Sequence, residues 1–284
     1  MLPAIGWSIA FLLLGFAFSF LLIGGLAYLL RRDVAAGLDA IQLSPALQAL
    51  ATGASLLGGF LAATWIVGRR ALGLDARTLR WRVGHGARGA GWGLAVGIGA
   101  ALLATGGAAL VGAAHWSHDR GGFGDYLAQV TKTVAVLAPA ALGEEVIFRG
   151  VPLVLLAGAI GRASAIVLVA GLAFAALHAI NPGITPLALG NIALAGIWLG
   201  VAFYAPGGIW TAFGSHLGWN AALAALDAPV SGLPFEIPLL DYHAGVPCWL
   251  TGCRFGPEGG LLATGALILA LLIAVQWARP GTAE

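Results

Sequence analysis

Eight stretches of this 284-residue chain are apolar over about the 20 residues that a helix needs to cross a bilayer. The chain is 60% hydrophobic and only 9% charged, whereas a soluble domain carries about 25% charged residues. This composition excludes an ordinary soluble enzyme, a disordered chain and a nucleic-acid-binding protein. We therefore expect an all-α polytopic membrane protein with about eight transmembrane helices, at residues 7–30, 45–68, 89–113, 129–159, 163–181, 185–204, 208–225 and 259–278.

The fourth stretch, residues 129–159, is too long for a single straight crossing. It contains Pro139 and Pro152, and each proline removes a backbone hydrogen bond, so each is expected to kink a helix. We therefore expect a span followed by a re-entrant or surface piece. Because the chain has neither an internal repeat nor a low-complexity linker, we predict one membrane domain over residues 1–284, with its chemistry within residues 129–225.

Lysine and arginine are enriched on the cytoplasmic side of membrane proteins. Nine of them flank the predicted spans on the side that holds both termini, against five on the other side, so we expect cytoplasmic termini. A single lysine among fourteen basic residues, with 44 glycines, is typical of high-GC bacterial coding. We accordingly expect a protein of the bacterial inner membrane, with the lipid bilayer as a partner. Its net charge of only +2 favours no nucleic-acid partner.

The connection between residues 227 and 258 is long and contains both cysteines, Cys248 and Cys253. The predicted topology puts this connection on the outer side, where a disulfide can persist. The spacing alone leaves a disulfide and two free thiols open, because the bond depends on Cβ geometry. Four histidines also lie in connections, where we expect them to be solvated: His85, His115, His118 and His243.

Ionisable side chains are absent from the first three predicted spans and gather in the later ones. A charge inside a bilayer costs at least about 2.5–3.5 kcal/mol, so it persists where it is paired or where it serves a function. The groups in question are Glu144, Glu145, Arg149, His178 and His216, with the amide of Asn220 beside the last of them.

Two glutamates adjoin each other in the first of these polar segments. Glu145 and Arg149 are four residues apart, so their side chains can form an ion pair on a helix. Glu144 is turned about 100° away by the helical period, and we expect no such partner for it on its own helix. A carboxylate of this kind in an apolar site is a candidate general base. The alternative is a structural packing network of all three side chains.

Two further pairs follow at the same four-residue spacing. Phe174 and His178 share a helix face just before a turn signal, and His216 and Asn220 share a face of a later span. Taken singly, such polar residues are equally well explained as hydrogen-bonded contacts between helices. A third pair of this spacing, Gly93 and Gly97, is typical of close helix packing.

The three polar segments together indicate a catalytic site more strongly than any one of them, because they can converge on a single pocket that contains water. A carboxylate, two imidazoles and an amide can activate a water molecule for hydrolysis of an amide bond. They can also stabilise an oxyanion through Asn220 or a histidine. A divalent metal such as zinc could be held by Glu144, His178 and His216.

These segments resemble a known family. In order, they match the three motifs of the CPBP family, the CAAX protease and bacteriocin-processing (Abi) intramembrane endopeptidases, which include the type II CAAX prenyl endopeptidase. The motifs stand here as Glu144-Glu145-x-x-x-Arg149, Phe174-x-x-x-His178 and His216-x-x-x-Asn220, within residues 129–225.

The resemblance implies a role for each motif residue. Glu144 would be the general base for the attacking water, and His178 would help to hold that water. His216 and Asn220 would polarise the scissile carbonyl, while the Glu145–Arg149 pair would order the site. The family has been described both as metalloproteases and as metal-free glutamate-type proteases, and the residues leave both open. The implied substrate is a membrane-associated protein or peptide.

Two other classes of protein share parts of this pattern. Intramembrane glutamate and histidine residues also serve as proton relays, so a proton-coupled transporter is one alternative. The other is a membrane immunity or scaffold protein that keeps the fold without the reaction.

Overall fold

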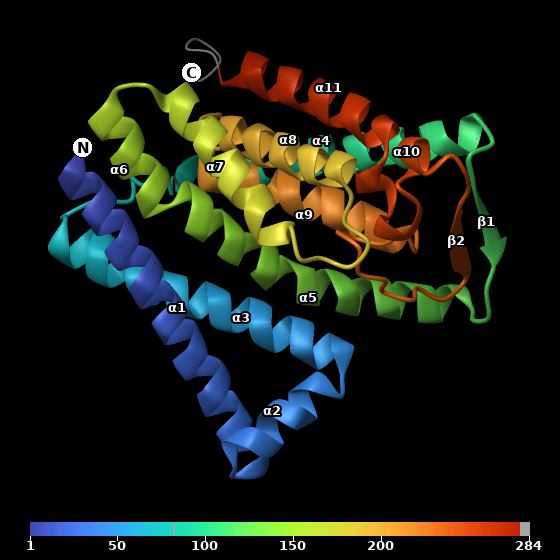
Figure 1. Cartoon of the computed structure of the whole chain (residues 1–284), viewed down its shortest axis with the longest axis horizontal. Coiled ribbons are helices and arrows are strands. Elements are labelled where there is room, and N and C mark those ends of the chain that lie inside the picture. The colour runs from blue at the N-terminus through green and yellow to red at the C-terminus, as the bar shows by residue number, and fades with distance from the viewer. Residues whose placement is uncertain (82, 279–284) are drawn as a thin grey trace. The chain divides into compact units, whose positions relative to one another are not determined.

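The computed structural model describes residues 1–81 and 83–278, whose regular secondary structure is helical apart from one pair of short strands (Figure 1). Among these residues, three helices are long and apolar enough to cross a membrane, and shorter apolar helices occupy residues 163–178, 186–202 and 261–277. All eight predicted spans lie in helical parts of the chain, so the all-α class is confirmed, and the long apolar helices make the chain an integral membrane protein, while the number of eight spans stays a prediction. Arg82 and Arg279, two of the basic residues behind the predicted orientation, lie outside the described residues.

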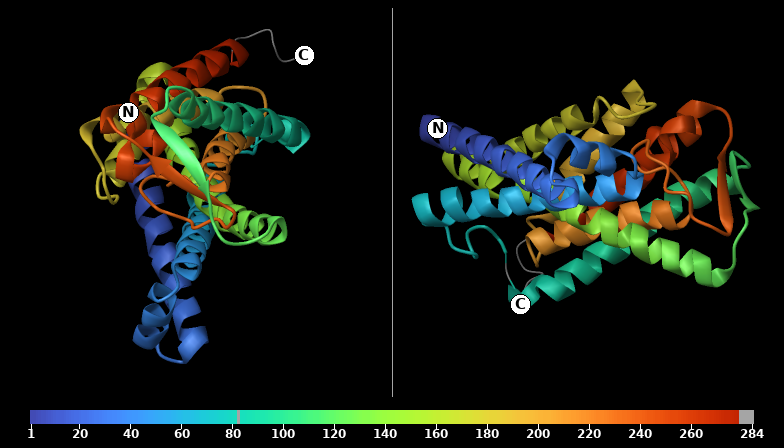
Figure 2. Two further views of the ribbon diagram at one scale, coloured as in Figure 1. Left: turned by 90° about the vertical axis from the view of Figure 1, so that its right-hand side faces the viewer. Right: turned by 90° about the horizontal axis from the view of Figure 1, so that it is seen from below.

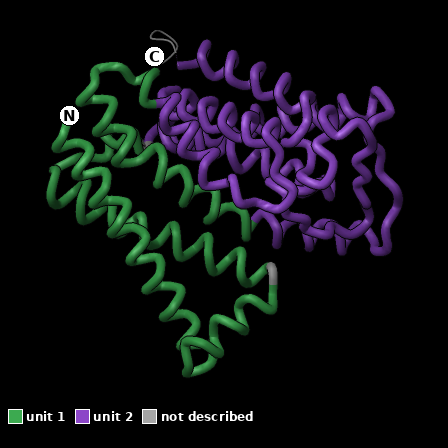
Figure 3. Tube along the Cα trace, viewed as in Figure 1, with its two compact units in different colours: residues 1–82, 135–166 green, residues 83–134, 167–284 purple. Residues whose placement is uncertain are grey.

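Two compact units make up the chain (Figure 3). Unit 1 comprises residues 1–82 and 135–166, and unit 2 comprises residues 83–134 and 167–284. Both units draw on separate parts of the sequence, so neither is a continuous domain. The prediction of one membrane domain over the whole chain stays a prediction.

Unit 1 is organised around the crossing of its first and third helices. It contains α1 (Leu2–Arg31), α2 (Val34–Gln42), α3 (Pro45–Ala63), the π-helical turn η1 (Thr64–Ala71), the second half of α5 (Phe123–Arg149), and α6 (Val151–Ile160). Phe60 of α3 is fully buried, and its ring lies 5.4 Å from the ring of Phe11 and 5.1 Å from that of Phe16. Gly53 of α3 is close to the backbone of Ala140, so α5 approaches α3 closely.

The long predicted span of residues 129–159 is two helices. α5 ends at Arg149, Gly150 caps the next helix, and Pro152 stands in the first turn of α6, where its missing N–H costs nothing. Pro139 lies inside α5, so the kink predicted there stays a prediction, whereas at the second proline the chain changes helix at Gly150, just before Pro152. The break after Arg149 puts the first polar motif in the last two turns of α5.

Unit 2 is built on the close packing of α4 (Val83–Leu110) against α9 (Ile209–Ala225). A Cβ on Gly93 would lie 2.7 Å from the backbone nitrogen of Ser215, and one on Gly97 would lie 2.7 Å from that of Trp219. Real side chains do not tolerate such distances, so α9 can approach α4 this closely only because glycine stands at both positions. The predicted packing role of this glycine pair is confirmed.

The remaining helices of unit 2 surround this pair. They are α7 (Ala163–His178), which begins in unit 1, α8 (Pro186–Ala202) and α11 (Leu261–Trp277). α11 packs against α8 and α4, and α8 also contacts α9.

A small extramembrane assembly connects α4 to α5 and α9 to α11. β1 (Ala114–His118) pairs antiparallel with β2 (Leu240–Ala244), and the two strands lie side by side in the left view of Figure 2. Trp116 of β1 donates its indole N–H to the carbonyl of Leu226 over 2.7 Å, which ties the strands to the end of α9. The chain then forms α10 (Cys248–Thr251), η2 (Cys253–Phe255) and η3 (Pro257–Gly259).

Cys248 and Cys253 form a disulfide across α10, with their Cα atoms 4.9 Å apart. This outcome decides between the two alternatives that the cysteine spacing left open. Two residues after Cys253, Phe255 is fully buried, so the chain is packed into unit 2 from that point. The disulfide therefore closes a short loop at the edge of a packed structure.

The glycines of α4 provide a test of the α4–α9 packing. Gly97→Ala should lower the free energy of unfolding by about 1–3 kcal/mol, because the added methyl group overpacks the contact with α9. Gly99→Ala is the matched control, since nothing lies within 4 Å of its Cβ position, and it should be neutral or slightly stabilising. Thermal unfolding in detergent measures both, and equal melting temperatures for the two variants would contradict this packing.

The disulfide can be tested by alkylation. Unfolded protein treated with iodoacetamide should gain no mass without reductant and two carbamidomethyl groups after reduction. Replacing both cysteines with serine should cost about 2 kcal/mol of stability, the loop-closure value for a short loop. Alkylation of the unreduced protein would contradict the bond.

Candidate active site

The first polar motif lies at the end of α5 in unit 1. Glu145 and Arg149 are both fully buried, and Nη1 of Arg149 donates to Oε1 of Glu145 over 3.1 Å. The predicted ion pair is therefore confirmed. The Arg149 guanidinium also stands 5.7 Å from the centre of the Phe148 ring, a cation–π distance.

Glu144 is half-buried, and its charge also interacts with that of Arg149. The expectation that Glu144 has no partner on its own helix is therefore wrong. The Arg149 guanidinium can interact electrostatically with both carboxylates, because Arg149 is only five residues beyond Glu144, little more than one helical turn. Glu144 differs from Glu145 in exposure rather than in being isolated from the cation.

The second motif lies at the end of α7 in unit 2. Nδ1 of His178 is 2.8 Å from the carbonyl oxygen of Phe174, one turn earlier. A carbonyl can only accept, so Nδ1 carries the hydrogen, and neutral His178 presents a lone pair at Nε2. The helix ends at His178, and Gly183 adopts a positive φ of 75° in the turn that follows, as the Asn181-Pro182-Gly183 sequence predicts.

The third motif lies in α9, whose rotation is held by the glycine contacts with α4. His216 is buried, and Asn220 stands one turn later and is half-buried. The two residues share one face of the helix. Trp219 between them is also buried and packs edge-on against Trp198, with ring centres 6.4 Å apart.

Phe174 brings the second and third motifs together within unit 2. Its buried ring lies 4.6 Å from the imidazole of His178 and 5.8 Å from that of His216, the latter in an edge-to-face arrangement. Two imidazoles from α7 and α9 therefore contact one aromatic ring. Their convergence with Glu144, which belongs to the other unit, stays a prediction.

The predicted zinc ligands Glu144, His178 and His216 likewise come from both units. Within either unit, the described residues contain no group of three or more His, Cys, Asp and Glu side chains that could hold a metal ion. The zinc site therefore also stays a prediction.

A buried carboxylate that the sequence analysis missed lies beside these motifs. Glu258 in η3 is only 5% exposed, and its Oε1 accepts from the indole N–H of Trp219 over 3.0 Å. Burial raises the pKa of the Glu258 carboxyl, while its hydrogen bonds from Ser231 and Trp219 act in the opposite direction. In the sequence, Glu258 stands at the edge of an apolar run, where an acidic residue normally marks the membrane interface, so no sequence signal singled it out.

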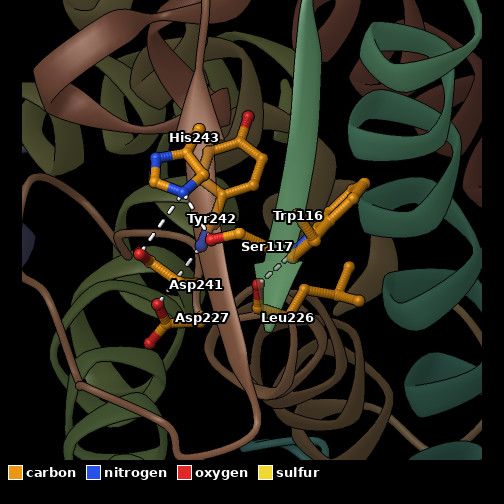
Figure 4. Close-up of polar contacts among 7 residues, drawn as sticks. All are labelled: Trp116, Ser117, Leu226, Asp227, Asp241, Tyr242 and His243. Carbon is orange, nitrogen blue, oxygen red and sulfur yellow. Dashed lines mark hydrogen bonds and ion pairs between the residues drawn. The ribbon is translucent and has the colours of Figure 1, made fainter. Parts of the chain in front are cut away.

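The strand pair carries an arrangement that resembles a serine–histidine–aspartate triad (Figure 4). Ser117 Oγ lies 2.8 Å from Nε2 of His243, and Asp241 Oδ2 lies 3.3 Å from the same nitrogen. A catalytic relay needs the carboxylate on the opposite ring nitrogen from the serine, so these three residues do not form one. The His243 side chain is 42% exposed, as expected for a histidine in a connection.

The central part of the chain is similar to a known protein family. Residues 126–222 match the family model described as "Type II CAAX prenyl endopeptidase Rce1-like". The match covers all three polar motifs. No curated protein and no solved structure matches the chain.

The buried ion pair on α5 gives a prediction for unit 1. Glu145→Gln should lower the free energy of unfolding by about 3–5 kcal/mol, because the buried Arg149 charge loses the carboxylate that it contacts. Changing both residues to glutamine should cost less than the single change. Arg162→Gln, at an exposed arginine of the same unit, is the control, and a Glu145→Gln variant as stable as this control would contradict the role of the pair.

Proposed function

Because residues 126–222 form a domain of the Rce1-like type II CAAX prenyl endopeptidase family, we propose that this integral membrane protein is an intramembrane endopeptidase. It hydrolyses a peptide bond of a membrane-associated protein or peptide, with a water molecule as the nucleophile. The observation that carries the proposal is the contact of both motif histidines with the ring of Phe174. This contact supports a shared site for motifs that are far apart in the sequence.

Glu144 is the proposed general base. Its carboxylate takes a proton from the water as the water attacks the scissile carbonyl, and the proton then passes to the leaving amine. The buried Glu145–Arg149 pair orders the end of α5 and so holds Glu144 in place.

His178 is suited to orient the attacking water. Its Nδ1–H is committed to the Phe174 carbonyl, so the Nε2 lone pair accepts a hydrogen from the water. His216 and Asn220 supply the donors for the oxyanion that forms on the carbonyl. Donors that are already held in place are worth more in a dry site than in water, because no reorganisation is needed.

The chemistry of the donor set also fits a zinc ion. A histidine whose Nδ1–H is bound to a carbonyl is the usual form of a zinc ligand, and His178 has this form. Glu144, His178 and His216 would hold the ion, which supplies a water of lowered pKa when it is bound.

The membrane-embedded motifs favour a hydrophobic or membrane-tethered substrate over a soluble one. We propose the inner membrane of a bacterium as the location, with both termini in the cytoplasm, on the basis of the basic residues beside the spans. The disulfide of the extramembrane assembly is consistent with an outer, oxidising compartment on that side.

The proposal is tested by Glu144→Gln. Purified wild-type protein in proteoliposomes should cleave members of a membrane-tethered peptide library, and the variant should lose about 10²–10⁴-fold of that rate, the range for a general base. Glu236→Gln, at an exposed glutamate, is the matched control and should cleave normally. Cleavage by Glu144→Gln at the wild-type rate would contradict the proposed base, and Glu144-dependent solute uptake without cleavage would favour a transporter.

Metal dependence is tested on the same preparation. Zinc content is measured together with cleavage before and after a chelator. Zinc at one ion per chain and a rate restored only by added metal would support the ligand set, whereas full activity in metal-free protein would contradict it.

A further inference from the structure

Glu258 is a buried acid whose two carboxylate oxygens bind two different parts of unit 2. Oε1 accepts from the indole N–H of Trp219 in α9, and Oε2 accepts from the backbone N–H of Ser231 in the long connection. The carboxylate is 5% exposed. Burying a charged carboxylate costs desolvation free energy that hydrogen bonds must offset, and here both oxygens accept from a donor.

The backbone around Glu258 is held independently of its side chain. Nδ2 of Asn191 in α8 donates to the carbonyl of Glu258 over 2.7 Å and to that of Gly260 over 2.9 Å. Thr264 of α11 in turn donates its hydroxyl to Oδ1 of Asn191 over 2.6 Å. The backbone of the short helix η3 is therefore tied to the apolar helices α8 and α11, so the Glu258 side chain extends from a fixed backbone.

Ser231 connects Glu258 to the segment that follows the second motif. The carbonyl of Ser231 accepts from Nδ2 of Asn181 over 3.0 Å, and Asn181 lies in the turn that directly follows His178. Gly232 packs against the carbonyl of Pro182 in the same turn. One carboxylate therefore connects the turn after the second motif to the helix of the third.

We propose that Glu258 is a positioning residue that fixes the third motif relative to the second through its bonds to Trp219 and Ser231. Trp219 lies between His216 and Asn220 in sequence, so holding its indole sets the rotation of the helix segment that bears both. The proposal rests on the proposed function, because it assigns Glu258 a part in the same site. Glu258 itself touches neither substrate nor water.

A neutral side chain would not replace this carboxylate. Glutamine at position 258 has one oxygen and one NH₂ group, so it can accept from only one of the two N–H donors. The NH₂ group would then face an N–H. Glu258→Gln preserves size while breaking the connection, which makes it the informative change.

The test is a double-mutant cycle on cleavage of a membrane-tethered peptide that the wild type cuts. Glu258→Gln and Trp219→Phe should each lower kcat about ten- to 150-fold with little change in KM, the size expected for one hydrogen bond to a charged group. The double variant should lose no more than the worse single variant, because both changes break the same contact. A product of the two single effects would overturn the proposal.

Matched controls separate positioning from simple destabilisation. Glu236→Gln makes the same change at an exposed glutamate, and Trp249→Phe makes the matching change at an exposed tryptophan. Both should retain wild-type kcat. A Glu258→Gln protein that melts earlier but keeps wild-type kcat when folded would show a merely structural role and overturn the proposal.

A second readout does not depend on activity. Hydrogen–deuterium exchange of the α9 amides at residues 216–222 should be faster in Glu258→Gln than in Glu236→Gln. Unchanged exchange would overturn the proposal even if Glu258→Gln failed to cleave. If the wild type shows no Glu144-dependent cleavage, the proposed function fails, and this exchange measurement alone decides whether Glu258 orders the third motif.

Discussion

The bilayer core has no water to hydrogen-bond a polar group, so a polar side chain kept within the spans is costly unless it finds a partner in the protein. The motif residues show how this requirement is met. Arg149 and Glu145 pair on one helix, and His178 bonds a carbonyl one turn back. Each bond also fixes an orientation or a tautomer. The absence of water makes these polar side chains unfavourable unless they are bonded, and the same bonds fix the orientation or tautomer that a catalytic role would need.

Close packing between helices is the second feature on which the site depends. The hydrophobic effect does little to bring helices together in lipid, because the lipid tails are themselves apolar. The helices α4 and α9 instead pack closely through glycines that let their backbones approach each other. This packing has a consequence for the site, because it sets the rotation of α9 and hence the direction of His216. Glu258 adds a second restraint on the same helix from the extramembrane side through Trp219. The third motif is thus held from two directions.

The local features of the site could be predicted from the sequence because each depends on a short spacing. The Glu145–Arg149 pair follows from a separation of four residues, and the end of α7 follows from Asn181-Pro182-Gly183. The interaction of Arg149 with Glu144 did not follow from that rule, since a long guanidinium reaches beyond the strict four-residue geometry.

The amino-acid sequence by itself determined that this chain lies in a membrane, which segments are helical, and which few polar side chains lie among apolar ones. Those properties depend on transfer from water to lipid and on neighbours within one helical turn. Only the tertiary structure decided that Phe174 contacts both histidines, that the cysteines are bonded, and that Glu258 holds Trp219. Such contacts join residues far apart in the chain, and their geometry depends on how whole helices and loops pack.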